Sequence, residues 1–414
     1  MKTVPFTIED ARGWSAQHPT PFYVYDEEGI RTCVENLKQA FSWNPGFREY
    51  FAVKATPTPA ILRHLKSMDS GTACASEAEV IMSTRCGIEG KRIMFTSNET
   101  SFAEYRTANS AGAIINLDDI QQIDIMEKAI GIPETVCCRY NPGEFAITSD
   151  IMGHLFDSKF GMTKAQLFES FRILREKGVQ HFGIHAMLSS NSLNEDYYPA
   201  LARELFGLVL EIKKELGISV EFTDFAGGIG IPYKPEDKAA DIFRIGAGVK
   251  KAYDELIAAN GMSLSIYTEL ARFVTGPHGY LVTSVIGKKS TYREYIGVDA
   301  TAACLMRPAI YGAYHHVTVL GKENQGASVK ADVVGSLCEN NDKFAVERML
   351  PETEIGDILV IHDSGAHGHS MGYNYNGKLR CAEFMMDKNK NLTMIRRAQT
   401  VEDLFACLDC DKEF

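Results

Sequence analysis

Short apolar segments alternate with helical patterns between Glu49 and Arg272 of this chain. Most of these segments are followed by turn residues, which is typical of buried strands. They are Tyr50–Ala55, Gly71–Ser76, Arg92–Ser97, Ala113–Asn116, Val136–Asn141, Gly183–Leu188, Glu221–Gly227 and Ser265–Leu270. Such an alternation of eight strands with helices predicts an N-terminal (β/α)8, TIM-like barrel in an α/β fold. The competing fold, an open doubly wound sheet, is disfavoured because no Gly-x-Gly-x-x-Gly sequence follows the first strand.

The pattern changes after His278, where strands joined by Gly-, Asn- and Asp-bearing turns replace the alternation. These strands are predicted at Tyr280–Lys288, Tyr292–Val298, His315–Thr318, Ala331–Ser336, Ile358–His362 and Leu379–Met385. They predict a C-terminal all-β domain, which we expect the early strand Pro21–Asp26 to join. The predicted organisation is a barrel over residues 42–277 and a β-domain made of residues 1–41 and 278–414.

The composition excludes several classes of partner. The formal net charge is −11, which argues against binding to nucleic acid or to an anionic membrane. No stretch approaches the roughly 20 apolar residues that span a bilayer, and the first ten residues lack the pattern of a signal peptide. The ten cysteines lack the spacing of a disulfide framework. We therefore expect reduced thiols and a cytoplasmic protein.

Lys54 lies near the end of the first predicted barrel strand. A lysine is rarely buried unless it is paired or used. At the C-terminal mouth of a barrel strand, a desolvated amine has a lowered pKa and attacks carbonyl groups. Lys54 is therefore a candidate Schiff-base lysine. The alternative is a strand whose last residue simply reaches solvent.

Further polar side chains and glycines follow the later strands, whose C-terminal ends meet at one face of a barrel. Gly227 and Gly228 would let backbone N–H groups approach a phosphate, and Ser190 would add a hydroxyl, although such a turn also fits an ordinary loop. Glu269 needs a partner, because an unpaired buried carboxylate is costly. It would either form an ion pair with Arg139 or the lysine, or keep a pyridine nitrogen protonated. A Schiff-base lysine, a phosphate cradle and such a carboxylate are what pyridoxal 5′-phosphate requires of a protein.

Several motifs along nearly the whole chain resemble those of the diaminopimelate decarboxylases, which belong to the alanine-racemase-like (fold type III) pyridoxal-phosphate enzymes. The matching motifs are Tyr-Phe-Ala-Val-Lys54-Ala, Lys159-Phe160-Gly161, Gly227-Gly228-Ile229-Gly230-Ile231-Pro232-Tyr233, Met306-Arg307-Pro308-Ala309-Ile310-Tyr311-Gly312-Ala313-Tyr314-His315, Gly335-Ser336-Leu337-Cys338-Glu339 and Ser370-Met371-Gly372-Tyr373-Asn374-Tyr375-Asn376. The Arg-Pro-Ala-x-Tyr-Gly-Ala-Tyr-His run points to this branch rather than to the ornithine decarboxylases. The resemblance implies decarboxylation of meso-2,6-diaminopimelate to L-lysine and CO2, the last step of lysine biosynthesis.

The resemblance also implies residue roles. Lys54 would carry the cofactor, Glu269 would hold the pyridinium, and Cys338 would reprotonate the carbon after CO2 leaves. The implied cofactor contacts are Lys54, Arg139, Met187, Ser190, Gly227, Gly228, Glu269, Ala271, Arg272 and Tyr375. The implied substrate contacts are Arg272, Arg307, Tyr311, Glu339 and Tyr375. Cys338 and Glu339 would reach the neighbouring subunit's site, so that the active unit would be a homodimer.

Four positions depart from the family pattern. Met187 stands where a histidine usually stacks on the cofactor ring, and Ala73 stands where an aspartate is usual. Ala226 and Ala271 each replace a glycine near the phosphate. The chain therefore resembles a divergent subfamily in which the electronics of the cofactor and the efficiency of the enzyme would differ.

Four alternatives remain at this stage. The first is a decarboxylase of another basic amino acid, such as D-lysine or D-ornithine. The second is a racemase on the same fold, although Cys338-Glu339 stands where racemases place a tyrosine. The third is a metal-dependent barrel hydrolase that uses His362, His367 and His369, and the fourth is a catalytically inactive regulator that keeps the fold.

Overall fold

The computed structural model describes residues 2–147 and 154–409, which form two compact units. The barrel unit comprises Arg31–Ile231 and Lys238–Phe273, and the sheet unit comprises Met1–Ile30, Pro232–Asp237 and Val274–Phe414. Compared with the predicted boundaries, residues 31–41 lie with the barrel, and residues 232–237 and 274–277 lie with the sheet.

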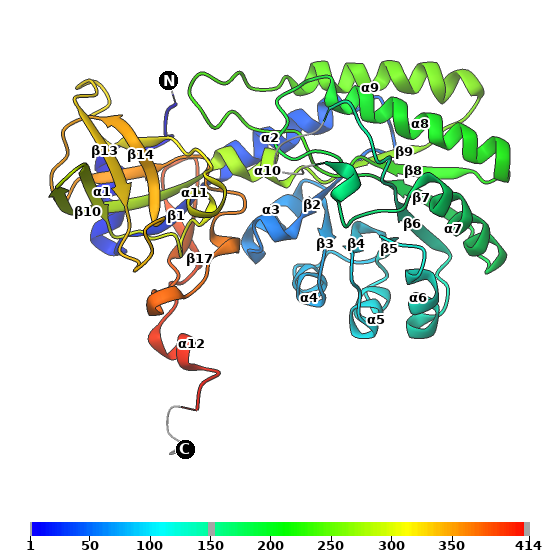
Figure 1. Ribbon diagram of the computed structural model, residues 1–414, viewed down its shortest axis with the longest axis horizontal. Coiled ribbons are helices and arrows are strands. Elements are labelled where there is room, and N and C mark those ends of the chain that lie inside the picture. The colour runs from blue at the N-terminus through cyan, green and yellow to red at the C-terminus, as the bar shows by residue number, and fades with distance from the viewer. Residues whose placement is uncertain (1, 148–153, 410–414) are drawn as a thin grey trace. The chain divides into compact units, whose positions relative to one another are not determined.

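The barrel unit is a closed ring of parallel strands, which confirms the predicted fold class (Figure 1). The strands are β2 (Arg48–Ala52), β3 (Gly71–Cys74), β4 (Ile93–Ser97), β5 (Ile114–Leu117), β6 (Thr135–Arg139), β7 (His181–His185), β8 (Val220–Asp224) and β9 (Ser265–Thr268). Pairing of β2 with β9 closes the ring, with Glu49 opposite Thr268. Strands such as β3 and β5 are buried at every position, as expected for parallel strands covered on both faces.

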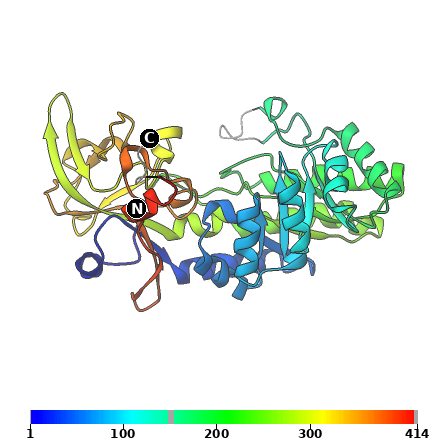
Figure 2. The same cartoon turned by 90° about the horizontal axis from the view of Figure 1, so that it is seen from below.

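Helices cover the outside of the ring, and Figure 2 shows those of its first half, coloured blue to cyan, side by side. They are α2 (Glu27–Ala40), α3 (Pro59–Ser67), α4 (Glu77–Arg85), α5 (Phe102–Ser110), α6 (Gln122–Ile130), α7 (Lys164–Glu176), α8 (Tyr197–Leu216), α9 (Ile242–Leu256) and α10 (Ala271–Thr275). Local sequence fixes several of their ends. A capping box joins Ser101 to Glu104 at the start of α5, and Gly217 ends α8 with a left-handed φ of 70°. None of the helices in the described ranges combines the length and apolar composition needed to cross a bilayer.

The sheet unit is built on a nine-stranded sheet in which neighbours follow the order β14-β13-β11-β10-β1-β16-β17. Its strands are β1 (Phe22–Asp26), β10 (Gly279–Ser290), β11 (Glu294–Val298), β12 (Val317–Val319), β13 (Val329–Val334), β14 (Lys343–Leu350), β15 (Ile358–Ile361), β16 (Ala382–Met386) and β17 (Leu392–Arg396). The early strand β1 pairs with both β10 and β16, so the first part of the chain lies within this sheet. β15 adds to β10, and β12 pairs with β15.

Three short helices accompany the sheet: α1 (Ile8–Gln17), α11 (Arg307–Tyr311) and α12 (Val401–Phe405). A capping box between Thr7 and Asp10 starts α1, and Trp14 packs its ring against Phe6 at a centroid distance of 5.0 Å. Both aromatic residues belong to a core cluster with strand residues such as Val360 and Phe384. The first helix therefore covers apolar surface of the sheet.

Two glycines inside barrel-unit helices offer a matched test of helix packing. A Cβ added at Gly246 in α9 would lie 2.4 Å from the carbonyl oxygen of Ala40, whereas one added at Gly207 in α8 would meet no heavy atom within 4 Å. We expect Gly246→Ala to lower the free energy of unfolding by about 1–3 kcal/mol, because backbone atoms must move apart. Gly207→Ala should instead raise it by about 0.5–1 kcal/mol, because alanine loses less backbone entropy. Denaturant unfolding of both variants checks this, and equal effects would contradict the packing argument.

Candidate functional site

Side chains from the carboxyl ends of several barrel strands form the candidate site. Lys54 lies two residues after β2, in a short 3-10 turn over Val53–Ala55, and not on the strand itself. Its two neighbours in the turn are buried while the Lys54 side chain is exposed, so the expectation of a desolvated amine at this position is wrong. The turn directs the Lys54 side chain away from its buried neighbours Val53 and Ala55. Its positive charge still acts on Glu269, which directly follows β9.

Glu269 lies in a pocket of positive charge inside the barrel. Its side chain is 11% exposed, and Oε2 lies 3.8 Å from Nε2 of His185, which is too far for a hydrogen bond. Burial alone would raise the pKa of the Glu269 carboxyl, but His185, Lys54 and Arg139 together hold that pKa below its usual value. Glu269 is therefore ionised at neutral pH.

One acceptor oxygen of this carboxylate could receive the N–H of the ring nitrogen of pyridoxal phosphate. Oε1 of Glu269 is buried and, among the described residues, has no hydrogen-bond partner. A protonated pyridine nitrogen presents one N–H donor, which is what a buried and ionised acceptor oxygen requires. The residues present here therefore fit the implied cofactor.

The glycine turn after β8 suits a close approach of backbone to a ligand. A Cβ at Gly227 would lie 3.2 Å from the carbonyl oxygen of Glu269 and 3.5 Å from Cε of Met187, and Gly228 has a φ of +122°. Ala226 also has a left-handed φ, of 52°, at the position where the family has a glycine. Two hydrogen bonds hold this strained alanine: its N–H donates to Oδ1 of Asp224 and its carbonyl accepts from the hydroxyl of Tyr198, each at 2.8 Å.

Several of the predicted cofactor contacts on the barrel lie next to one another. An N–H of Arg272, in the first turn of α10, lies 3.4 Å from Oγ of Ser190. The loop that carries Ser190 is bonded to the glycine turn, because the Ser192 N–H donates to the carbonyl of Gly228 at 2.7 Å. Ala271, the other departure from a glycine, is buried. The structure therefore brings Ser190, Arg272 and the glycine turn together.

Arg139 at the end of β6 is a buried cation with defined partners. It forms an ion pair of 3.3 Å with Asp118, and its guanidinium lies 4.5 Å from the ring centroid of Phe160. The other oxygen of Asp118 accepts the N–H of Gly161. Burial lowers the pKa of Arg139 while Asp118 and Glu269 raise it. The Lys159-Phe160-Gly161 motif thus packs against the arginine that faces the candidate site.

The remaining predicted residues belong to the sheet unit. Arg307 is buried in α11 and donates to the hydroxyl of Tyr233 at 2.6 Å, with Nε2 of His315 at 3.2 Å. Tyr311 is 60% exposed and Tyr375 is 52% exposed. Cys338 and Glu339 are also exposed, in the loop after β13. The N–H of Cys338 donates to Oδ1 of Asn376 at 2.7 Å, so this loop lies beside the one that carries Tyr375.

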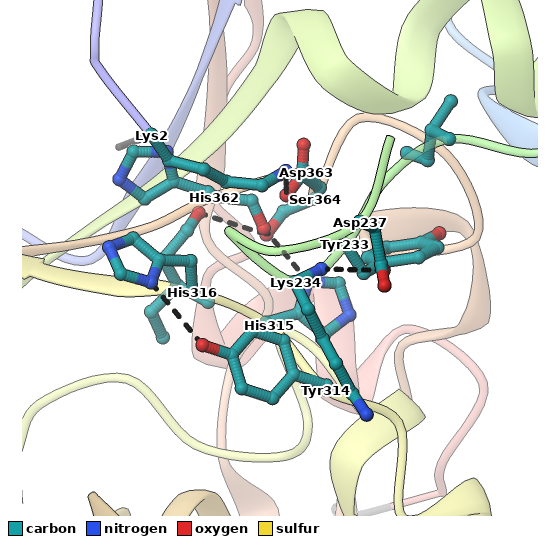
Figure 3. Close-up of polar contacts among 12 residues, drawn as sticks. Lys2, Tyr233, Lys234, Asp237, Tyr314, His315, His316, His362, Asp363 and Ser364 are labelled. Carbon is teal, nitrogen blue, oxygen red and sulfur yellow. Dashed lines mark hydrogen bonds and ion pairs between the residues drawn. The ribbon is translucent and has the colours of Figure 1, made fainter. Parts of the chain in front are cut away.

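The histidine-based hydrolase hypothesis is wrong. Nε2 of His362 lies 2.8 Å from Oγ1 of Thr318, and Nε2 of His369 lies 3.0 Å from the carbonyl of Cys381. Figure 3 shows His362 near His316 and His315, with the ring of His316 directed at the hydroxyl of Tyr314. Among the described residues, the group with the spacing of a metal site is instead His185, Asp224 and Glu269.

Three of the acidic and basic groups in the barrel interior were not singled out from the sequence: His185, Asp224 and Glu49. Each lies alone in an apolar strand segment, which reads as a hydrogen-bonded core residue. Asp224 is fully buried at the end of β8. Its pKa is raised well above the usual value, mainly by burial and further by the charge of Glu269. Burial also raises the pKa of Glu49 to about 8, although both its oxygens accept hydrogen bonds. The signal available in the sequence was their position at or near strand ends of a predicted barrel.

Removing Asp118 should strongly destabilise the barrel unit. Asp118→Ala leaves the Arg139 charge buried without its carboxylate, and we expect a loss of about 3–5 kcal/mol in the free energy of unfolding. The control is Glu255→Ala, which breaks a pair with Arg203 whose side chains are 46% and 45% exposed. That loss should stay below about 1 kcal/mol. Similar losses in the two variants would show that the buried pair has no special importance.

The sheet unit should lose stability in acid partly through His362. Burial lowers the pKa of His362 from 6.5 to about 3. The unfolded chain then takes up a proton that the folded chain refuses, so stability is complete above pH 6.5 and is lost as the pH falls towards 3. His362→Gln should therefore flatten the fall of the unfolding free energy between pH ~7 and ~5 by about 2 kcal/mol. Exposed His154→Gln is the control, and equal slopes in wild type and His362→Gln would contradict this assignment.

Comparisons with known proteins agree with this site. The model of the pyridoxal binding domain of pyridoxal-dependent decarboxylases matches residues 28–276. The chain is 42% identical over 386 residues to Protein TabA of Pseudomonas amygdali pv. tabaci, covering 93% of this chain and 90% of TabA. It is 32% identical over 403 residues to the diaminopimelate decarboxylase of Methanothermobacter thermautotrophicus, covering 95% and 93%.

Solved structures give the same result over the whole chain. Diaminopimelate decarboxylase from Helicobacter pylori complexed with L-lysine is similar with a TM-score of 0.88 and 27% identity, covering 96% of this chain and 98% of that one. The enzyme from M. jannaschii in complex with L-lysine gives a TM-score of 0.89 at 27% identity, covering 96% and 94%. The predicted family, fold and cofactor are confirmed: the chain belongs to the fold type III pyridoxal-dependent decarboxylases and is a PLP-dependent amino-acid decarboxylase.

Proposed function

We propose that this enzyme decarboxylates meso-2,6-diaminopimelate to L-lysine and CO2. The observation that carries the proposal is Arg307, a buried arginine on α11 inside the run Arg-Pro-Ala-Ile-Tyr-Gly-Ala-Tyr-His. Diaminopimelate has a distal carboxylate that other basic amino acids lack. Relatives that cover more than nine tenths of this chain at about 30% identity carry the name diaminopimelate decarboxylase, which supports the same substrate.

The surroundings of Arg307 suit a carboxylate. The hydroxyl of Tyr233 and the imidazole of His315 both lie within hydrogen-bond distance of Nη1, and the guanidinium carbon lies 4.7 Å from the Tyr233 ring centroid. These contacts fix the plane of the guanidinium. A planar fork held in one orientation binds a carboxylate through two parallel hydrogen bonds, which an ammonium group does not reproduce.

Each predicted catalytic residue has a defined task in the proposal. Pyridoxal phosphate supplies the electron sink that accepts the electron pair left when CO2 departs. Lys54 would hold the cofactor through its amine, and Glu269 would accept the N–H of the ring nitrogen. The residues that would hold its remaining polar groups are Arg139, Ser190, Arg272, the glycine turn and Tyr375. Met187 would pack its thioether against the aromatic ring.

The proposal includes a homodimer with shared sites. Cys338 and Glu339 are exposed in the loop after β13, where the resemblance implies that they serve the neighbouring subunit. Cys338 donates the proton to the carbon that lost CO2, and Glu339 with Tyr311 contacts the distal end of the substrate. Exposure of these side chains in a single chain is what a contribution to a second subunit requires.

The second candidate is decarboxylation of a different basic amino acid. The observation that favours it is the 42% identity to TabA, which exceeds the identity to each of the diaminopimelate decarboxylases compared here. The replaced positions Met187, Ala226 and Ala271 are consistent with a substrate that is held differently. D-lysine and D-ornithine are the substrates to compare, because each has a basic end without a distal carboxylate.

Product analysis separates the two candidates. With added cofactor, purified enzyme should release CO2 from meso-diaminopimelate and form L-lysine, with kcat/KM for D-lysine and D-ornithine lower by at least about 100-fold. Arg307→Met should lower kcat/KM for diaminopimelate by about 100-fold, because the distal carboxylate loses its partner. It should leave decarboxylation of the two D-amino acids little changed. Lys54→Ala is the inactive control, and a wild-type enzyme that prefers D-lysine or D-ornithine would refute the proposal.

A further inference from the structure

Three titratable side chains meet inside the barrel, and each has at least one buried polar atom without a hydrogen-bond partner among the described residues. His185 ends β7, Asp224 ends β8 and Glu269 follows β9, and one polar atom of each lies within 4.8 Å of the other two. His185 is 1% exposed and Asp224 is fully buried. Within the described residues, both ring nitrogens of His185, Oδ2 of Asp224 and Oε1 of Glu269 accept or donate no hydrogen bond. Groups of this kind are usually satisfied when buried, so their arrangement needs an explanation.

The two carboxyl groups cannot both be ionised. Like charges at this separation in a buried site push one pKa up strongly, and one proton remains on the pair. The environment decides which group keeps the proton. Glu269 faces the cations Lys54 and Arg139, whereas Asp224 accepts the N–H of Ala226 on Oδ1. Burial and the neighbouring Glu269 raise the pKa of Asp224 well above its usual value, while that of Glu269 is lowered.

We propose that Asp224 is a positioning residue that carries this proton, and that its neutral carboxyl keeps Glu269 ionised and aligned for the ring nitrogen of the cofactor. The proton on Oδ2 can be donated towards Glu269 or towards a neutral nitrogen of His185. Either arrangement leaves Oε1 of Glu269 as the acceptor for the pyridine N–H. The inference deepens the role proposed above for Glu269 and is independent of which amino acid is decarboxylated.

Other titratable groups surround the pair and must be separated from it in any test. They come from the neighbouring strands and helices and are Glu49, Lys54, Cys137, Arg139, His185 and Tyr198. Burial raises the pKa of Cys137 and Tyr198 well above their usual values and lowers that of His185, so these three are neutral near pH 7. Glu49 is the one that requires a control, because burial raises its pKa to about 8.

Infrared spectroscopy of the cofactor-free protein tests the protonation directly. At neutral pH, with a metal chelator present, we expect the carbonyl stretch of a protonated carboxyl group that disappears in Asp224→Asn. The matched control Glu49→Gln should remove a different component, one that in wild type is lost as the pH rises through about 8. The Asp224 component should persist above that pH. A spectrum unchanged by Asp224→Asn, or a component that only Glu269→Gln removes, would overturn the proposal.

Cofactor binding supplies the second readout. Asparagine keeps a neutral donor at the same place, so Asp224→Asn should bind pyridoxal phosphate within about threefold of wild type, whereas Asp224→Ala should bind about tenfold more weakly. The visible absorption band of the bound cofactor should stay unchanged over the same pH range in Asp224→Asn as in wild type. In Asp224→Ala that pH range should be narrower. Equal weakening by both variants would show that Asp224 is ionised or only structural. If Asp224→Ala fails to fold, the infrared result for Asp224→Asn decides alone. These measurements use no substrate, so their outcome does not depend on whether diaminopimelate is the substrate.

Discussion

The arrangement of this site depends on one ionised carboxylate inside a closed barrel, that of Glu269. Burial disfavours the charge on Glu269, and the charge persists because His185, Lys54 and Arg139 face it. Each of those groups has to be held in turn. Arg139 is fixed by Asp118, whose second oxygen accepts the N–H of Gly161. The pKa of Glu269 therefore depends on side chains at the ends of several strands. The ion pair between Arg139 and Asp118 contributes to it because it holds Arg139 in place.

Closure of the barrel is what brings these groups within reach of one another. The lysine and the glutamate are more than two hundred positions apart, yet they follow adjacent strands because β2 pairs with β9. Glu49 on β2 strengthens this join, since its two oxygens accept the hydroxyl of Thr268 and the N–H of Leu270. That contact fixes the backbone on either side of Glu269. The buried glutamate on β2 thus orients the backbone around the one that follows β9.

The sequence predicted the strands of the barrel well and the details of their ends less well. Each of the eight predicted segments overlaps a barrel strand, because a buried parallel strand is a run of apolar residues. Lys54 was placed on a strand, but the strand stops at Ala52 and a 3-10 turn carries the lysine outward. Hydrophobic pattern does not distinguish a strand residue from the first turn after it. In the sheet unit, β14 and β17 were missed because their exposed positions interrupt the apolar alternation.

The site residues were likewise predicted only in part. Residues in distinctive motifs, such as Gly227, Gly228 and Arg307, could be named from the sequence because several neighbours constrain their identity. His185 and Asp224 could not, because a lone polar residue in an apolar strand carries no local sign of its partners. Their partners come from other strands and appear only when the ring closes. The reverse error occurred at His362 and His369, where closeness along the chain suggested a common ligand, but Nε2 of each ring is bonded to a different protein atom.

Met187 and Ala226, two of the departures from the family pattern, lie at the glycine turn and leave the charged groups around Glu269 in place. Met187 and Gly227 lie against each other, and Ala226 keeps a left-handed backbone that two hydrogen bonds stabilise: Asp224 accepts its N–H and Tyr198 donates to its carbonyl. The hydrogen bond to Asp224 couples the two sets of residues. In the proposal above, the same carboxyl keeps Glu269 ionised and holds the strained alanine through its other oxygen. A protonated Asp224 can do both, since one oxygen accepts the Ala226 N–H while the other carries the proton. The strain at the glycine turn and the charge on Glu269 therefore depend on a common side chain, which explains how the turn tolerates an alanine while Lys54, Glu269 and Arg272 are retained.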